Sequence, residues 1–211
     1  MIDTLLPDAV VVVTAEPADE QRPLFPGEEA RVAIAVPSRR AEFAAGRASA
    51  RAALRTLGVS ETAILADERR APLWPDGTVG SITHCAGFTA AAVASRRDIA
   101  MLGIDAEPRG DLDDADLVLS DGERRRAAAL LGADADRLLF SVKESVYKAW
   151  YPATGRWLDF RDVAVAVERD GSFTVEPGEH LTPDDRTLLA RLRGRYVLTS
   201  EHVFTAVHTP A

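Results

Sequence analysis

The sequence predicts an α+β fold, and three observations lead to this prediction. A long helix followed by about three strands is expected twice along the 211 residues. Hydrophobic residues make up 46% of the chain and charged residues 27%, which is the composition of an ordinary globular protein. A chain of this length buries enough surface to fold without a disulfide. We therefore expect two similar lobes related by a pseudo-two-fold axis, each with a long helix packed on a small, mostly antiparallel sheet.

The first half of the chain is predicted to hold one helix and four strands. Residues 10–13 are a run of β-branched residues and predict a strand. A short apolar segment follows at 32–36. Ser38 is the expected N-cap of a helix that runs to Leu57 and stops at Gly58. Its core face consists of apolar residues at helical spacing: Phe43, Ala50, Leu54 and Leu57.

Three strands are predicted after a turn-rich loop at 71–77. They cover residues 79–84, 88–95 and 99–105, and short turns join them. The first of these turns is Ala86-Gly87, and the second is a charged turn at 96–98.

The second half is predicted to hold two helices and four strands. Residues 120–123, Ser-Asp-Gly-Glu, form a capping box that opens a helix to Leu131. A longer helix is expected over 136–151, with Pro152 as its stop. The strands of this half are expected at 163–167, 172–175, 195–201 and 203–208.

We place the boundary between the lobes in the segment 101–103, where the element order starts again. The N-terminal lobe then covers residues 1–102 and the C-terminal lobe residues 103–211. No sequence repeat supports a duplication, so this prediction depends on element order alone.

Cysteine content and charge exclude several classes of protein. The single cysteine, Cys85, excludes an internal disulfide and a multi-cysteine zinc site. The 25 basic residues against 33 acidic ones give a net charge of −8, which disfavours a general nucleic-acid binder. The first residues lack a basic segment followed by an apolar run, and no apolar run approaches the length of a membrane span. We expect a cytoplasmic protein with no nucleic-acid or membrane partner.

The predicted helix of the first half is strongly basic. Residues 39–55 hold five arginines against one glutamate, a local charge of +4 in an acidic protein. Arg47, Arg51 and Arg55 follow one another at i, i+4 and i+8. A solvated helix face explains such a run, and a surface that binds phosphate is the alternative.

Two carboxylates lie together at the end of a predicted strand, in the motif Gly-Ile-Asp-Ala-Glu-Pro at 103–108. Alternation along the strand puts Asp105 and Glu107 on one face, about 7 Å apart. Such a pair can share a hard cation through its oxygen atoms. A solvent-facing pair is the alternative.

Both lysines of the chain fall in the second long helix, in the motif Phe-Ser-Val-Lys-Glu-Ser-Val-Tyr-Lys at 140–148. Glu144 and Lys148 are neighbours at i and i+4. A weak surface ion pair is one interpretation. The other is a third carboxylate for the cation, beside an ammonium group for a phosphate.

A third motif, Gly-Ser-Ile-Thr-His at 80–84, lies in a predicted strand. Ser81 and Thr83 alternate onto one face and offer hydroxyl donors. His84 is either a structural histidine or a donor to a phosphate. The three motifs together contain what a polyphosphate site needs, although the chain has neither a P-loop nor a dinucleotide-binding glycine motif.

The three motifs occur in the order and approximate spacing found in the 4′-phosphopantetheinyl transferases. The chain resembles the monomeric surfactin/enterobactin-type branch of that family, over about residues 38–160. The segments Trp-Pro-Asp-Gly at 74–77 and Arg-Trp-Leu at 156–158 are similar to the enterobactin-type subgroup.

This resemblance implies a monomeric enzyme of two α+β lobes that binds coenzyme A, its substrate, and Mg²⁺ or Mn²⁺ in the cleft between them. The implied reaction transfers the 4′-phosphopantetheine arm to a serine of an apo acyl or peptidyl carrier protein and releases 3′,5′-ADP. Fatty-acid, polyketide and non-ribosomal peptide synthases, including those of secondary metabolism, contain such carriers. The loop and helix at 109–131 are expected to contribute to the acceptor surface.

The resemblance implies a role for each residue of this chain that stands at a functional position of a family motif. Asp105, Glu107 and Glu144 would hold the metal, and Glu144 would also be the general base. Lys148 would bind the coenzyme phosphates. His84 would bind the 3′-phosphate together with one arginine, Arg47 or Arg39. Arg40 and Arg51 are the other candidates for this arginine. The full set of candidate coenzyme contacts is Arg39, Arg47, Ser81, Thr83, His84, Lys143 and Lys148.

Two other functions fit the same residues. One is a non-catalytic module that binds coenzyme A or a nucleotide, and the other is a Mg²⁺-dependent phosphohydrolase that uses water in place of the serine. The intact set of Asp105, Glu107, Glu144 and Lys148 favours an enzyme, because a binding module needs no base beside a metal.

Overall fold

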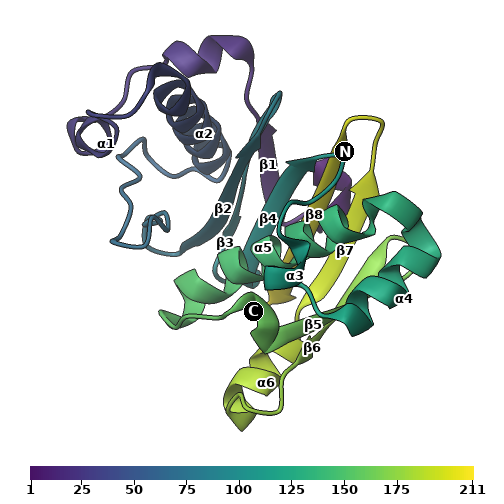
Figure 1. Cartoon of the computed structure of the whole chain (residues 1–211). Coiled ribbons are helices and arrows are strands. Elements are labelled where there is room, and N and C mark those ends of the chain that lie inside the picture. Colours follow the sequence, from purple (N-terminus) through teal and green to yellow (C-terminus); the bar gives the residue numbers. More distant parts are fainter.

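The computed structural model describes residues 1–211 as two antiparallel sheets, each covered by one long helix (Figure 1). The first sheet has the order β1-β3-β2, and its strands are β1 (Val10–Thr14), β2 (Thr78–Cys85) and β3 (Phe88–Ser95). The second sheet has the order β4-β8-β7-β6-β5, and its strands are β4 (Ile99–Pro108), β5 (Val163–Val167), β6 (Ser172–Pro177), β7 (Arg193–Leu198) and β8 (His202–Pro210). This architecture confirms the predicted α+β fold.

The two long helices have twenty residues each: α2 (Pro37–Thr56) and α5 (Ala135–Thr154). The shorter helices are α1 (Pro26–Arg31), α3 (Ala115–Val118), α4 (Asp121–Leu131) and α6 (Pro183–Ala190). Four short 3₁₀ segments complete the structure: η1 (Ile2–Leu5), η2 (Pro17–Gln21), η3 (Gly132–Asp134) and η4 (Phe160–Asp162). None of the helices has the length and apolar character that a membrane crossing requires.

The helix α2 covers the first sheet with small apolar side chains. Ala50, Ala53 and Leu54 are buried against Ala91 and Val93 of β3. Their helical spacing puts all three on one face of α2. The polar residues of α2 therefore lie on its other faces.

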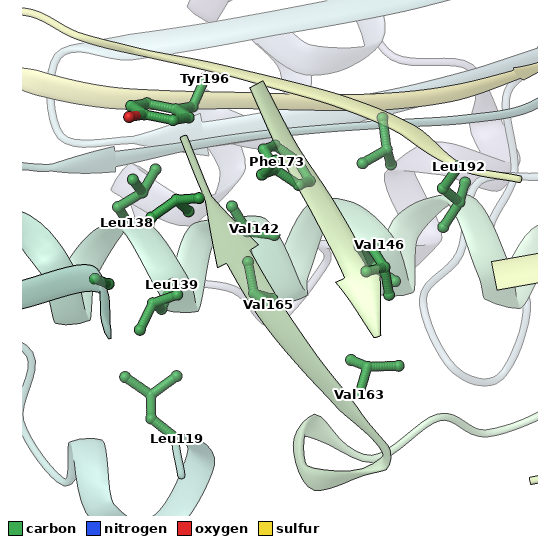
Figure 2. Close-up of a cluster of buried hydrophobic side chains, with 14 of the residues drawn as sticks. Leu119, Leu138, Leu139, Val142, Val146, Val163, Val165, Phe173, Leu192 and Tyr196 are labelled. Carbon is green, nitrogen blue, oxygen red and sulfur yellow. The ribbon is translucent and has the colours of Figure 1, made fainter. Parts of the chain in front are cut away.

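The helix α5 covers the second sheet with larger side chains (Figure 2). Leu138, Val142 and Val146 lie on its buried face, against Val165 of β5 and Phe173 of β6. Fully burying one such side chain stabilises the fold by about 1.5–3 kcal/mol. This cluster therefore fixes α5, and with it the polar residues on the remaining faces of the helix.

The two sheets meet along β2 and β4, which run side by side without sharing a backbone ladder. Side-chain hydroxyls join them instead. The Ser81 Oγ accepts from the Ile104 N–H at 3.1 Å, and the Thr83 Oγ1 accepts from the Ala106 N–H at 3.0 Å. The alternation predicted for this motif is therefore present, and it places both hydroxyls between the lobes.

Two glycines allow close packing beside this junction. At Gly103 a Cβ atom would lie 1.9 Å from the Ser145 carbonyl oxygen, so α5 packs directly on the backbone of β4. At Gly80 a Cβ atom would lie 2.7 Å from the ring of Trp74, which therefore rests on the backbone of β2. The glycines that begin two of the sequence motifs thus have packing roles.

Helix ends differ from the prediction in two places. Val36, not Ser38, is the N-cap of α2, because Pro37 occupies the first helical position, for which its missing N–H suits it. Gly58 does follow the helix, at φ +76°. The helix α5 continues through Pro152 and ends at Gly155, in the left-handed conformation. A proline so close to the C-terminus removes only one hydrogen bond from the helix.

Three other features were not anticipated. The helix α6 was missed, although Thr182 caps it and Pro183 and two aspartates begin it. In the segment 32–36 only Val32 is buried, and Ile34 is fully exposed. The boundary placed at 102/103 falls inside β4, which belongs entirely to the second sheet, so the chain passes from one sheet to the other at 96–98.

Candidate active site

A pocket of about 670 Å³ lies between α2, β2, α5 and the loop at 66–72. Its wall is rich in cations, which come from the end of α1, from α2, from the loop and from α5. They are Arg31, Arg39, Arg47, Arg69, Arg70 and Lys148. His84 and Glu144 line the same pocket. The pocket therefore suits an anionic ligand with more than one charged group.

Arg39 and His84 form a pair in this wall. The Arg39 Nη1 lies 2.5 Å from the His84 Nε2, and the His84 Nδ1 lies 3.5 Å from a Glu42 oxygen. Burial and the adjacent Arg39 hold the pKa of His84 below its usual value, so the imidazole is neutral at pH 7. Since Arg39 donates to Nε2, the ring proton belongs on Nδ1.

Arg47 is a nearly buried cation with unused donors. Its Nε donates to the Ile64 carbonyl at 2.7 Å, and its guanidinium lies 4.3 Å from the centre of the Phe43 ring. Its two terminal nitrogens make no hydrogen bond within the protein. Burial lowers the pKa of Arg47 to about 10, which still leaves it charged at pH 7. These free donors are available to a ligand in the pocket.

Of the four arginines that are candidates for the phosphate contact, two line the pocket and two do not. Arg51 donates to both oxygens of the buried Glu28, at 2.9 and 3.0 Å. Arg40 pairs with Glu29 on the surface. Neither lines the pocket, whereas Arg39 and Arg47 do. The arginine run is therefore not simply a solvated helix face.

Asp105 is buried at the end of the pocket that contains Lys148. Its carboxylate accepts from the Lys148 Nζ at 2.5 Å and from the Ser141 Oγ at 2.8 Å. The Thr83 hydroxyl lies 3.3 Å from the same carboxylate. In this arrangement Lys148 pairs with Asp105 rather than with Glu144, its neighbour along the helix.

Glu107 and Glu144 lie close enough to Asp105 to respond to its charge. Burial, together with Asp105, raises the pKa of Glu107 to about 7, against the opposing effect of Arg137, whose Nη1 lies 3.3 Å away. Burial also raises the pKa of Glu144, and Lys148 opposes this shift. For Glu107 and Glu144, burial therefore outweighs the effect of the neighbouring cations.

These carboxylates fit a divalent metal ion by their chemistry. Hard oxygen donors are the ligands that Mg²⁺ takes, and the raised pKa values of Glu107 and Glu144 are consistent with room for a further cation beside them. In the structure, however, no group of three acidic, histidine or cysteine side chains converges tightly enough to hold a metal ion. The ammonium of Lys148 lies on Asp105 instead.

Two predicted coenzyme contacts have other partners in the structure. Lys143 is buried in an ion pair with Glu123 at 2.8 Å and also donates to the Val118 and Phe160 carbonyls. It does not line the pocket, which corrects its assignment as a coenzyme contact. Thr83 is buried as well, and its hydroxyl is already used between the lobes. Ser81 lines the pocket while its Oγ accepts from β4.

The sequence prediction missed several cations of this site. Arg69, from the loop at 66–72, lies 5.2 Å from the Trp157 ring and 5.7 Å from the Tyr151 ring, so it bridges the two lobes. Arg31 donates to the Asp67 carbonyl at 2.8 Å. These residues lie in a loop and at a helix end, where no periodic pattern distinguishes them. Only the doublet Arg69-Arg70 before a proline was available as a signal.

Comparisons with known proteins agree with this arrangement. Residues 27–94 match the model of the 4′-phosphopantetheinyl transferase N-terminal domain, and residues 101–205 match that of the 4′-phosphopantetheinyl transferase superfamily. The 4′-phosphopantetheinyl transferase Svp of Streptomyces mobaraensis is 51% identical over 185 residues, which cover 83% of this chain and 75% of Svp. The 4′-phosphopantetheinyl transferase Npt of Nocardia iowensis is 39% identical over 221 residues, covering 98% and 99%. Enterobactin synthase component D of Salmonella typhi is 43% identical over 118 residues, covering 53% and 48%.

Proposed function

The chain belongs to the 4′-phosphopantetheinyl transferase superfamily and transfers the phosphopantetheine arm of coenzyme A to a carrier protein, and we propose that it does so as a magnesium-dependent monomer, in the pocket between its lobes. One observation carries the proposal. A single pocket has Arg39, Arg47 and His84 on one side and Glu144 with Lys148 on the other. The first group suits a terminal phosphate, and the second suits the chemistry at a pyrophosphate.

The arginine side of the pocket is proposed to bind the 3′-phosphate. Arg47 offers two unused terminal nitrogens, and guanidinium groups match phosphate oxygens in a fork geometry. Arg39 holds His84 at the same wall. A charge-assisted hydrogen bond contributes about 1.5–3 kcal/mol, so each contact is worth roughly 10- to 150-fold in affinity.

The carboxylate side is proposed to carry the reaction. Asp105, Glu107 and Glu144 would hold Mg²⁺ or Mn²⁺, which when bound supplies charge neutralisation at the pyrophosphate. Glu144 accepts the proton of the carrier serine as the serine oxygen attacks the phosphorus next to the pantetheine. The bond from that phosphorus to 3′,5′-ADP breaks, and 3′,5′-ADP leaves with the electron pair.

Lys148 is proposed to stabilise the phosphates through the same step. It lines the pocket and its ammonium group pairs with Asp105, so a phosphate bound in the pocket would be within its reach. The lysine ammonium is a compact charge on a flexible side chain, so it can stay close to the phosphate oxygens during the transfer. The carrier is proposed to approach over the loop and helix at 109–131, where Leu117 of α3 is 69% exposed.

One incubation tests this function against the two alternatives. The protein is mixed with coenzyme A and an apo carrier, with and without Mg²⁺, and carrier mass and free 3′,5′-ADP are followed. We expect the carrier to gain one phosphopantetheine arm only when the metal is present. Release of 3′,5′-ADP without a carrier would indicate a phosphohydrolase, and binding without turnover would indicate a binding module. Full turnover in excess chelator would refute the metal dependence.

A further inference from the structure

A fully buried carboxylate lies one layer behind the pocket. Glu28 of α1 is 0% exposed, and its oxygens accept from the Arg51 Nη1 at 2.9 and 3.0 Å. They also accept the N–H of Ile64 at 2.9 Å and that of Phe25 at 3.0 Å. A buried charge is costly unless it is paired and hydrogen-bonded, and Glu28 meets both conditions.

Ile64 connects this carboxylate to the pocket. While its N–H donates to Glu28, its carbonyl accepts from the Arg47 Nε at 2.7 Å. Its side chain is buried in the core beneath α2, so the residue has little freedom to move. The orientation of the Arg47 guanidinium therefore depends on a backbone group that Glu28 holds.

Glu28 also gives Arg47 and Arg51 different surroundings. Arg51, one turn beyond Arg47, donates from Nη1 to Glu28 and from Nη2 to the Pro23 carbonyl at 3.3 Å, and it does not line the pocket. Arg47 keeps its terminal nitrogens for the pocket. The charge of Glu28 also offsets the repulsion that Arg51 exerts on Arg47.

The helix α1 holds the basic loop at a second point. Arg31, at its end, donates to the carbonyl of Asp67, three residues after Ile64. The loop that carries Arg69 and Arg70 is thus attached to α1 through both Glu28 and Arg31. The short helix α1, which reaches the pocket only at Arg31, in this way contributes to the position of the other cations in the pocket wall.

We propose that Glu28 is a positioning residue for the 3′-phosphate of coenzyme A, acting through Ile64 on Arg47. This inference depends on the proposed role of Arg47. Glu28 does not touch the ligand. It fixes the carbonyl to which Arg47 is anchored, so that the guanidinium presents its terminal nitrogens at one place.

The test compares Glu28→Gln with Glu29→Gln. Glu29 is the next residue of α1, and its pair with Arg40 lies on the surface, so the control makes the same chemical change outside the pocket. The measured quantities are kcat and KM for coenzyme A and for 3′-dephospho-coenzyme A. We expect Glu28→Gln to raise KM for coenzyme A by about tenfold, equivalent to the loss of about 1.4 kcal/mol. Its kcat and its KM for the dephospho form should change less than about twofold, and Glu29→Gln should match wild type.

Further variants separate this inference from the proposed function. If Arg47→Ala leaves the preference for coenzyme A intact, the role of Arg47 is wrong. If Arg47→Ala removes the preference and Glu28→Gln keeps it, only the positioning role is overturned. The double variant should lose no more preference than Arg47→Ala alone, because both act on one contact.

A purely structural role for Glu28 predicts a different result. Activity would then fall equally with both coenzymes, and this outcome overturns the proposal. If Glu28→Gln fails to fold by circular dichroism, Glu28→Asp keeps the charge and shortens its reach. Full preference for coenzyme A in that variant would likewise overturn the proposal, and a selective rise in KM would support it.

Discussion

The two lobes contain the same buried ion pair at equivalent places. Glu28 is the third residue of α1, and Glu123 is the third residue of α4. Each accepts the N–H of the residue before its helix and pairs with a cation of the long helix that follows, Arg51 or Lys143. Each also accepts a backbone N–H from further along the chain, that of Ile64 or of Val165. The pseudo-two-fold relation that no sequence repeat reveals is therefore visible in these contacts.

The two pairs differ in their relation to the pocket. Arg47 lines the pocket one turn from Arg51, so the pair in the first lobe lies directly behind the pocket wall. Lys143 lies on a face of α5 that the pocket does not reach, and its neighbour Glu144 lies on the face that it does. The same arrangement thus lies beside the proposed coenzyme-binding wall in the first lobe and beside the proposed catalytic residues in the second. Substitutions in the two lobes should accordingly affect different quantities.

The largest effect is expected at the chemical end of the second lobe. Glu144→Gln keeps the shape of the side chain but cannot accept a proton. Loss of a general base costs about 10²- to 10⁴-fold in kcat, and we expect KM for coenzyme A to stay near the wild-type value. Steady-state kinetics with one apo carrier measure both. A kcat close to wild type would mean that Glu144 only forms part of the helix surface.

The next largest effect is on stability and concerns the pair that is remote from the pocket. Lys143→Met leaves Glu123 buried without its partner, which costs about 3–5 kcal/mol. For a chain of this size the melting temperature should fall by roughly 6–20 °C. The double variant with Glu123→Gln should recover part of this loss. A selective rise in KM for coenzyme A in Lys143→Met would instead restore the role first predicted for this lysine.

The sequence predicts those parts of the molecule whose interactions join residues close together along the chain. The long helices, most strands and the capping box at Ser120 depend on residues within a few positions of one another, and periodicity identifies them. Glu28 has no such local signal, because Phe25 replaces the usual Ser or Thr before its helix. Its two distant partners, Arg51 and Ile64, lie 23 and 36 residues away. Only the folded chain reveals what it does.

The candidate site shows the same limit. The motifs placed Asp105, Glu144, Lys148 and His84 near one another, because each motif combines chemistry with a defined strand or helix. Lys143 was misassigned because a helix motif does not tell which face its neighbours bury. Arg69 was missed because its position depends on aromatic rings from the other lobe.

The smallest effect concerns protonation at the coenzyme end. Burial and Arg39 hold the pKa of His84 below 6.5 in the free protein, whereas a nearby phosphate dianion favours the charged ring and raises that pKa. Binding of 3′,5′-ADP should therefore take up a fraction of a proton at a pH between the free and the bound pKa, and affinity should increase as pH falls from the bound pKa towards the free pKa. Calorimetry in two buffers of different ionisation enthalpy measures the uptake.

The ligand phosphate also takes up a proton, so the decisive quantity is the difference in proton uptake between wild type and His84→Ala. His180→Ala is the control, because His180 is exposed and pairs with Asp162 outside the pocket. Equal uptake by wild type and His84→Ala would place the phosphate away from His84 and leave Arg39 and Arg47 as its only proposed partners.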